Sequence, residues 1–490
     1  MGIIQIKNLS FTYPGAPTAV FDRLSVNLDD HWKLGMIGRN GRGKTTFLNL
    51  LRGQLPDHGA IRANVSFQYF PNPPQQAAVT VMQVMTATGA AEWQASVELA
   101  RIGLPATIGD RVFATLSGGE QTKVLLARGF VNQTDFPLID EPTNHLDILG
   151  RQRVGDYLRH KRGFICVSHD QDFLDRFVDH VMSLNRSSVD LVAGTVQDWQ
   201  AEKRLRDQAA VTQNERLQRN IRQLKQRAST QRNWAEQREG ETNDATSRAK
   251  AAKLMRRAKS FEARTRQRVE ERQGLVADVD TVTRLSTGLT RQKNDGQLLL
   301  SLRQYVPQRA GRALFVPIDL DFHQGDRLAI LGPNGVGKTS LVTSLLHPTT
   351  LTTTGYQVNH LPHDVAVVSQ DFATVVRQMR PADWGDDQTR TNVWNIMHQL
   401  GVSRTRLRAP AAQWSMGEAK KAALAVTLCQ PHALLVWDEP TNYLDIDARE
   451  QLIDVLKAAR PTVIIIDHDR HFVDQVCTQQ LVLRPTENKN

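Results

Sequence analysis

A glycine-rich phosphate-binding pattern occurs twice in this sequence, and its repetition limits the possible folds more than any other feature. The pattern G-x-x-x-x-G-K-[ST] fits residues 38–45 and residues 332–339. Each copy follows a short apolar segment, at 34–37 or 328–331, and precedes a predicted helix. In a strand–loop–helix unit, backbone N–H groups and the helix N-terminus point toward a bound phosphate. One match can be a mere glycine-rich turn, but two matches in the same context predict two nucleotide sites.

The two loops offer the same groups to a nucleoside triphosphate. Lys44 and Lys338 are placed to reach its β- and γ-phosphates. The hydroxyl groups of Thr45 and Thr339 can ligate Mg²⁺, so ATP and Mg²⁺ are the expected cofactors. The predicted nucleotide-binding residues are Gly38, Asn40, Gly41, Gly43, Lys44, Thr45 and Thr46 in the first loop and Gly332, Asn334, Gly335, Gly337, Lys338, Thr339 and Ser340 in the second.

Four landmarks recur in the same order, which identifies the chain as two copies of one domain. The loop lysines are 294 residues apart, and a serine, a glutamate and a histidine recur after 298, 298 and 299 residues. We therefore expect one domain at residues 1–197, a second at residues 296–490, and a linker at residues 198–295. Their strand–loop–helix units place both domains in the α/β class.

A serine loop opens a later helix in each copy. Ser117 is followed by Gly118 and Gly119, and this helix N-terminus is suited to a second phosphate contact. The second copy begins with Ser415 but has Met416 in place of the first glycine. The predicted ATP contacts of the two loops are Ser117, Gly118, Gly119, Glu120, Ser415, Gly417 and Glu418.

An Asp-Glu pair after an apolar strand, and a histidine after a later strand, predict the hydrolytic groups. Glu141 and Glu439 stand where a general base would orient the attacking water. The histidines follow these glutamates by 28 and 29 residues, and the matched offsets favour a γ-phosphate sensor over a structural role. The predicted catalytic residues are Glu141, His169, Glu439 and His468, and the predicted Mg²⁺ ligands are Thr45, Asp140, Asn72, Thr339, Asp438 and Gln370.

Two of these assignments leave an alternative open. Gln370 follows a strand of the second copy, where its carbonyl can contact Mg²⁺ and water. In the first copy either Asn72 or Gln68 can take that place. Tyr13 and Tyr305 follow the opening strand of each copy and are predicted ATP-binding residues whose rings stack on adenine. A partly buried turn aromatic would have the same position in the sequence.

Residues 198–280 differ from both copies in composition and charge. They are rich in Gln, Arg, Lys, Glu and Ala, which predicts two antiparallel helices joined by a turn at residues 240–244. Between residues 216 and 259 there are 13 Lys/Arg and 4 Asp/Glu, a net charge of +9. A solvated coiled-coil surface is normally balanced in sign, so this excess indicates a polyanionic partner, RNA. The predicted RNA contacts are Arg232, Trp234, Arg238, Arg248, Lys250, Lys253, Arg256, Arg257 and Lys259, although Trp234 can also cap the helical seam.

The remaining composition excludes several classes of protein. No apolar run approaches the roughly 20 residues needed to span a bilayer, and the N-terminus lacks the features of a signal peptide. The three cysteines (Cys166, Cys429 and Cys477) are isolated, so neither a disulfide framework nor a zinc site is expected. We expect a cytoplasmic protein with no membrane partner and no metal other than Mg²⁺.

Taken together, these motifs resemble those of ATP-binding cassettes, and the twin-cassette chain resembles the ABC-F family of ribosome-associated ATPases. The resemblance implies two P-loop ATP-binding-cassette domains joined by a long antiparallel α-helical hairpin. It also implies a monomer in which two ATP molecules lie head-to-tail between the cassettes. Lys44 would share one site with Ser415, and Lys338 would share the other with Ser117. The implied partner is the ribosome, through rRNA and through tRNA at or near the exit site.

Two insertions found in some ABC-F proteins are not expected here. About 45 residues separate Asn72 from Ser117, and 22 follow His468, which leaves no room for a long arm or a C-terminal extension. This form, with residues 33–44 and 437–440, resembles the subgroup that confers resistance to lincosamides, streptogramin A and pleuromutilins, although the linker tip is shorter. The alternatives are a housekeeping ABC-F translation factor, a fused ATPase subunit of an importer, and a DNA-repair or chromosome-maintenance ATPase.

Overall fold

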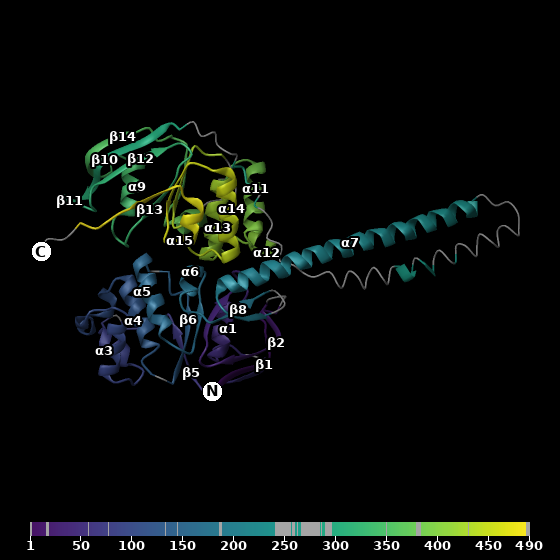
Figure 1. Ribbon diagram of the computed structural model, residues 1–490, viewed down its shortest axis with the longest axis horizontal. Helices are drawn as coiled ribbons and strands as arrows, with labels where there is room; N and C mark the ends of the chain where they lie inside the picture. Colours follow the sequence, from purple (N-terminus) through teal and green to yellow (C-terminus); the bar gives the residue numbers. More distant parts are fainter. Residues whose placement is uncertain are drawn as a thin grey trace. The chain divides into compact units, whose positions relative to one another are not determined.

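The computed structural model forms two compact units (Figure 1). The first contains Met1–Gln197 and Val282–Asn490, and the second contains Asp198–Thr281. Both copies of the repeat therefore lie in the first unit. The structure describes residues 2–486 with the exception of 16–18, 57, 77, 133, 145, 186–188, 241–255, 257–259, 262, 266–284, 286, 290–295, 349, 379–383 and 430.

The first half of the repeat places its nucleotide motifs at one edge of a parallel sheet. The sheet has the order β5-β6-β7-β3-β8-β9, with parallel pairing from β5 to β8 and an antiparallel last strand. Because parallel strands end at the same edge, the loops after β3, β6 and β7 lie together. A second, antiparallel sheet has the order β2-β1-β4. The strands are β1 (Ile3–Phe11), β2 (Phe21–Asp29), β3 (Lys33–Ile37), β4 (His58–Arg62), β5 (Ser66–Phe70), β6 (Asp135–Asp140), β7 (Phe164–Val167), β8 (His180–Leu184) and β9 (Val189–Ala193).

Several helices of the first half begin at a residue that caps their free N–H groups. Ser117 accepts a hydrogen bond from the backbone N–H of Glu120, and the Glu120 carboxylate accepts one from the Ser117 N–H. Asp147 and Asp170 cap the next two helices with side-chain oxygens. A cap of this kind contributes about 0.5–2 kcal/mol, so the motif loops are held at defined helix starts. The helices are α1 (Lys44–Leu51), α2 (Val81–Thr86), α3 (Glu92–Arg101), η1 (Ala106–Asp110), η2 (Phe113–Thr115), α4 (Gly118–Arg128), α5 (Ile148–Arg159) and α6 (Gln171–Leu174).

The second half repeats this arrangement, and the predicted α/β class is confirmed. Its parallel sheet has the order β15-β16-β17-β13-β18, which corresponds strand for strand to β5-β6-β7-β3-β8. Antiparallel pairs join β10 to β11, β12 and β14. The strands are β10 (Leu298–Arg309), β11 (Arg312–Ala313), β12 (Ile318–His323), β13 (Arg327–Leu331), β14 (Thr352–Asn359), β15 (Val365–Val368), β16 (Leu434–Asp438), β17 (Val463–Ile466) and β18 (Gln479–Val482). The helices are α9 (Lys338–Leu346), α10 (Phe372–Gln378), α11 (Asp387–Gln399), α12 (Arg404–Leu407), η4 (Ala411–Gln413), α13 (Met416–Cys429), α14 (Ile446–Ala459) and α15 (Arg470–Val476).

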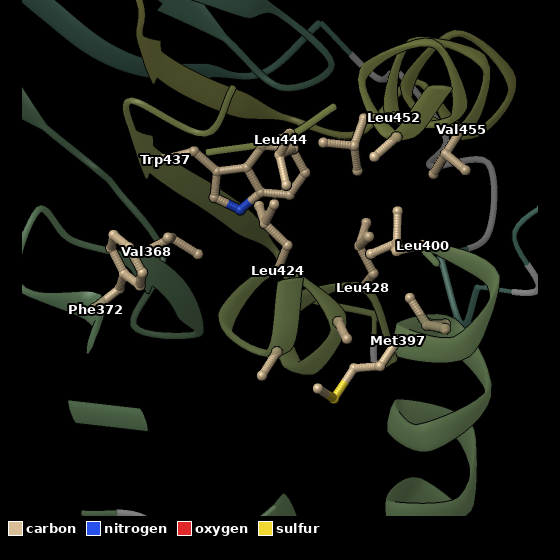
Figure 2. Close-up of a cluster of buried hydrophobic side chains, with 14 of the residues drawn as sticks. Val368, Phe372, Met397, Leu400, Leu424, Leu428, Trp437, Leu444, Leu452 and Val455 are labelled. Atoms are coloured by element: carbon tan, nitrogen blue, oxygen red, sulfur yellow. The ribbon is translucent and has the colours of Figure 1, made fainter. Parts of the chain in front are cut away.

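A hydrophobic cluster fixes helix α13 against the strand that ends in Asp438 (Figure 2). Leu424 and Leu428 of α13 lie between Trp437 of β16 and Met397 of α11, and all four side chains are fully buried. Burying a leucine side chain contributes about 1.5–3 kcal/mol. The helix that follows the second serine loop and the strand that carries the second Asp-Glu pair are therefore packed as one piece.

The second compact unit is built on α7 (Val196–Gly240), a single helix of 45 residues. At 1.5 Å per residue, a helix of this length measures about 68 Å. Ile221 and Ala228, two turns apart, are buried, whereas Arg216 and Arg222 are exposed. Of the predicted second helix, residues 256, 260, 261 and 263–265 are helical, and the rest lies outside the described residues. Within the described ranges, no helix combines the length and the apolar character needed to cross a membrane.

Candidate active sites: two composite nucleotide sites

Each glycine-rich loop turns from a strand into a helix through a left-handed glycine. Gly43 precedes α1 with a φ of 91°, and Gly337 precedes α9 with a φ of 105°. An added Cβ at Gly43 would lie 2.5 Å from Cγ1 of Val20. A larger residue there would be strained in its backbone and would clash with its neighbour, so the loop requires glycine.

The loop lysines are buried cations that lie over their own loops. Lys44 Nζ donates to the carbonyl oxygens of Gly38 (2.7 Å) and Arg39 (3.3 Å). Lys338 Nζ makes the equivalent contacts in the second half, at 2.9 and 3.0 Å. Burial lowers the pKa of both ammonium groups, and nearby carboxylates oppose that shift. A triphosphate would give each lysine anionic oxygens in place of neutral carbonyls.

A carboxylate and a threonine hydroxyl meet beside each lysine. Thr339 Oγ1 donates to Asp438 Oδ2 at 2.8 Å. In the first half, Thr45 Oγ1 donates to Asp140 Oδ2 at 2.9 Å. Asp438 Oδ1 is buried and accepts no hydrogen bond from any described residue, and burial raises the pKa of this carboxyl to about 6.

This donor set fits Mg²⁺, which prefers oxygen ligands. The buried, unpaired Asp438 Oδ1 lacks the positive partner that a divalent cation would be. Thr339 and Asp438 would hold the ion in one site, and Thr45 and Asp140 in the other. When bound, Mg²⁺ would withdraw negative charge from the β- and γ-phosphates.

The glutamate after each of these aspartates has the same unusual backbone. Glu141 and Glu439 have φ values of 49° and 50°, in the left-handed region. The Glu141 N–H donates to the carbonyl of Val167 at 2.9 Å, and the Glu439 N–H donates to that of Ile466 at 2.7 Å. Each glutamate is thus tied to the strand that leads to the histidine. Burial raises the pKa of Glu141 to about 7, against the opposing charge of the loop lysine, which suits a general base.

Both predicted sensor histidines are buried and neutral. His169 Nε2 lies 3.0 Å from Asn40 Oδ1 and 3.5 Å from Glu141 Oε1. His468 has two buried ring nitrogens, and neither is hydrogen-bonded to any described residue. Burial lowers the pKa of His468 to about 3 and holds the pKa of His169 well below its usual range. A neutral imidazole can donate one N–H to a γ-phosphate oxygen, so this geometry suits the sensor role.

One cavity of about 740 Å³ contains the lysine of the second half and the serine of the first, and we call it site 2. Its volume lies within the range of about 300–1,000 Å³ that is usual for small-molecule sites. The predicted residues that line it are Ser117, Gly118, Gly119, Glu120, Asn334, Gly335, Gly337, Lys338, Thr339, Ser340, Gln370 and Glu439. Sequence reasoning missed Lys123, Asn144, Leu146, Asp147, Gly150 and Arg309, which line the same cavity.

Two aspartates that cap helices also join the halves. Asp147 Oδ2 accepts a hydrogen bond from the N–H of Asn334 (3.3 Å), and Asp445 Oδ2 accepts one from the N–H of Asn40 (3.2 Å). An added Cβ at Gly417 would lie 3.4 Å from Asn40 Nδ2, so the second serine loop faces the first phosphate loop. We call this site 1. The structure thus brings together both head-to-tail pairings that the resemblance implied.

A model of the ABC transporter family matches residues 21–144 and residues 315–442, one stretch in each half. The chain belongs to the ABC transporter family. Its halves are ATP-binding cassettes, called cassette 1 and cassette 2 from here on, and the chain is an ATPase.

Relatives of known name match almost the whole chain. The ribosome protection protein VmlR of Bacillus subtilis is 27% identical over 98% of this chain and 86% of its own length. The ATP-binding protein Uup of Caulobacter vibrioides is 29% identical over 98% of this chain and 77% of its own length. The archaeal ribosome recycling factor aABCE1, in complex with the stalk protein aP1, has the same fold, with a TM-score of 0.59 and 17% identity over 94% of this chain and 84% of its own. The two relatives confirm the ABC-F resemblance of the twin-cassette chain, and the aABCE1 structure confirms its fold.

Strand register distinguishes the two residues left open in cassette 1. Phe70 of β5 pairs with Ile139, just as Val368 of β15 pairs with Trp437. Asn72 therefore has the place of Gln370, whose Nε2 donates to Glu439 Oε1 at 3.3 Å. Gln68 lies within strand β5, paired with Pro137. Asn72 is thus the structural counterpart of Gln370, and its contact with Mg²⁺ stays a prediction.

Cassette 1 has a further contact to its metal-binding carboxylate that the sequence did not reveal. Tyr69 Oη donates to Asp140 Oδ2 at 3.1 Å, and the Arg52 guanidinium lies 4.3 Å from the centre of the Tyr69 ring. By strand register, the counterpart of Tyr69 in cassette 2 is Val367, which cannot donate. The two metal-binding carboxylates are therefore held differently.

The two predicted adenine-stacking tyrosines have opposite environments. Tyr13 is 43% exposed, and its Oη lies 2.9 Å from Thr46 Oγ1, at the start of the phosphate-loop helix. Tyr305 is 1% exposed and hydrogen-bonds Ser344 Oγ at 3.1 Å. The prediction for Tyr305 is wrong, because β10 continues to Arg309 and places this ring inside the core. Arg309 lines site 2 instead.

The predicted RNA contacts lie in the second compact unit. Trp234 is 50% exposed on α7, and Arg256 is exposed on a helical segment. Arg232 and Arg238 belong to α7, but their side chains are not described. The others, namely Arg248, Lys250, Lys253, Arg257 and Lys259, lie outside the described residues.

Proposed function

We propose that this protein is an ATP-driven ribosome-binding protein that protects the peptidyl-transferase region from antibiotics. One observation carries the proposal: a chain with two complete nucleotide sites has, between its two cassettes in the sequence, a long basic helix that ATP hydrolysis alone does not require. The match over 98% of this chain to a relative named for ribosome protection supports the same role.

The geometry of the two sites defines the ATP-driven step. Each site takes its phosphate loop from one cassette and its serine loop from the other, so a bound triphosphate would hold the cassettes together. Glu141 and Glu439 would then orient the attacking water, and Lys44 and Lys338 would stabilise the charge on the γ-phosphate. Loss of that phosphate removes the shared contacts, and the cassettes separate. Binding would thus favour the closed form and hydrolysis would release it.

The linker supplies the positive surface that a ribosomal partner needs. Five basic residues of α7 are exposed within three turns, whereas the apolar Ile221 among them is buried. Lysine and arginine contact RNA phosphates without reading the sequence, and their contribution falls as salt rises. The exposed Trp234 would add a stacking surface for an unpaired base. The five exposed basic residues are Arg216, Arg219, Arg222, Lys225 and Arg227.

A trapped variant tests ribosome binding. Glu141→Gln with Glu439→Gln removes both general bases but leaves the phosphate cradle, so hydrolysis should fall by about 10²–10⁴-fold while ATP still binds. In co-sedimentation with ribosomes, we expect this variant to pellet in an ATP-dependent and salt-sensitive manner. Phosphate release at the wild-type rate would contradict the assignment of the glutamates.

A charge-matched pair of variants then tests the linker. Replacing Arg216, Arg222 and Lys225 with glutamine in the trapped variant should weaken co-sedimentation without changing ATP affinity. The control replaces three exposed basic residues of the cassettes and has the same net charge. If both variants pellet equally well, the basic helix is not the RNA-binding element. The control residues are Lys7, Arg62 and Arg312.

Drug susceptibility separates protection from a general role in translation. Wild-type protein in a sensitive host should raise the inhibitory concentration of at least one lincosamide, streptogramin A or pleuromutilin. Trp234→Ala, or deletion of residues 235–244, should remove that protection while both cassettes still hydrolyse ATP. If none of the three drug classes is resisted and the trapped variant still stalls translation, the housekeeping role is correct. ATP-dependent association with a membrane protein and not with ribosomes would favour the importer subunit.

A further inference from the structure

Cassette 2 contains a buried lysine beneath its Asp-Glu pair. Lys420, on α13, is 1% exposed. Its Nζ donates to the backbone carbonyl of Asp438 at 3.0 Å and lies 4.4 Å from the centre of the Phe372 ring. A buried ammonium is costly unless it is hydrogen-bonded, and the Asp438 carbonyl supplies such a bond. The hydrogen bond is made to the same residue that meets Thr339 in site 2.

Cassette 1 has no charge at the equivalent place. Counted from the two serine loops, the counterpart of Lys420 is Thr122, which is also buried. A second exchange accompanies the first, because Asp467 of cassette 2 corresponds to Ser168 of cassette 1. Both residues accept a hydrogen bond from the backbone two positions later, since Asp467 Oδ1 accepts from the Asp469 N–H at 2.9 Å and Ser168 Oγ accepts from the Asp170 N–H at 3.1 Å. One cassette thus has a Lys and Asp where the other has a Thr and Ser.

The second exchanged residue of cassette 2, Asp467, interacts electrostatically with Lys420. Asp467 is 1% exposed and accepts hydrogen bonds from Thr441 and from the His468 N–H. Burial lowers the pKa of Lys420 to about 8, and the negative charges of Asp467, Asp438 and Glu439 oppose the shift. Cassette 1, with Thr122 and Ser168 at these two places, has no such pair of buried ionisable side chains.

We propose that Lys420 is a positioning residue for site 2, which fixes the backbone of Asp438 and thereby the carboxylate that meets Thr339 and would hold Mg²⁺. In site 1 the corresponding carboxylate is held through its side chain, by Tyr69. The two sites thus reach the same arrangement by different means. The inference rests on the ATPase activity and is independent of the ribosomal role.

Nucleotide binding in single-site variants tests this proposal. Lys44→Ala leaves only site 2 able to bind ATP, and Lys338→Ala leaves only site 1. The readout is the Mg²⁺ concentration needed for half-maximal binding of a fluorescent ATP analogue, which does not depend on hydrolysis. With Lys44→Ala, Lys420→Thr should raise that concentration about tenfold, the effect of losing one charged hydrogen bond. With Lys338→Ala, Lys420→Thr should leave the Mg²⁺ concentration for half-maximal binding unchanged.

A second variant separates positioning from folding. Lys420→Thr alone leaves Asp467 buried without its counter-charge and is expected to lower Tm. Adding Asp467→Ser installs the neutral pair of cassette 1, so the double variant should recover Tm but still require about tenfold more Mg²⁺ at site 2. Thr122→Val, the matched control in cassette 1, should leave both sites unchanged. The proposal is overturned if the double variant has wild-type Mg²⁺ dependence at site 2, or if site 1 shifts as much as site 2.

Discussion

Glu141 and Glu439 hold a backbone conformation that side chains with a Cβ usually avoid. Such a residue costs on the order of 1–3 kcal/mol and persists only where its surroundings determine it. Here the N–H of each glutamate is tied to the strand before the histidine. Both cassettes therefore keep the same local strain at the residue that would orient the attacking water.

The raised pKa of Glu141 gives site 1 a defined dependence on pH. A general base must be ionised, so hydrolysis at site 1 should increase as pH rises through about 7, the pKa to which burial raises this carboxyl. Glu439→Gln isolates site 1 for the measurement of kcat from about pH 5.5 to about pH 8.5 at saturating ATP. A flat profile over this range would show that Glu141 is not the titrating base.

At the residue scale, local patterns predicted the groups that lie in continuous motifs. The phosphate loops, serine loops and Asp-Glu pairs each act through neighbours in the sequence, so their chemistry can be read from spacing alone. Tyr305 was misassigned because strand β10 continues to Arg309. Tyr305 therefore lies within the strand and not after it, and its side chain is in the core. Tyr69 and Lys420 were missed because their hydrogen-bond partners are 71 and 18 residues away, and Arg309 was missed because both halves of the chain form the cavity that it lines.

Helices α5 and α14 begin at equivalent aspartates whose lysine partners differ in burial, since Lys123 is partly exposed and Lys421 is buried. Asp147 and Asp445 both cap their helix and both accept from the opposite phosphate loop. Asp445 also pairs with Lys421 at 3.2 Å, and both side chains are buried. This ion pair holds the pKa of Asp445 well below its usual range. Neither these two caps nor the ion pair beneath one of them was predicted from the sequence.

Truncating the two aspartates should therefore destabilise the protein to different degrees. Asp147→Ala removes a cap and should cost about 0.5–2 kcal/mol. Asp445→Ala removes a cap and also leaves Lys421 buried without a counter-charge, which should cost about 3–5 kcal/mol more. Thermal unfolding without nucleotide measures the loss of stability in each of the two variants. Equal decreases in Tm would show that the Lys421 pair adds nothing to stability.

At the scale of the whole molecule, each nucleotide site is built from both cassettes. Site 2 combines Lys338 with Ser117, which are far apart in the sequence. Interactions within one site should be strongly non-additive, whereas those in different sites should be closer to additive.

A double-mutant cycle on ATP hydrolysis tests this crossed arrangement. Lys338→Ala and Ser117→Arg disable the same site, so their combination should be no slower than Lys338→Ala alone. Lys44→Ala with Ser117→Arg disables both sites and should lower the rate by about a further tenfold or more. If Lys338→Ala with Ser117→Arg hydrolyses ATP more slowly than Lys44→Ala with Ser117→Arg, then Lys338 and Ser117 belong to different sites.

The crossing of the phosphate and serine loops has a genetic consequence. A chain stopped after cassette 1 would keep the first phosphate loop and lose the serine loop that faces it, and it would also lose the phosphate loop that faces Ser117. Neither ATP would then have a complete set of contacts. A nonsense mutation in the second half of the gene should thus be as severe as one near its start, and co-expression of the missing half, not a second copy of the first, should complement it.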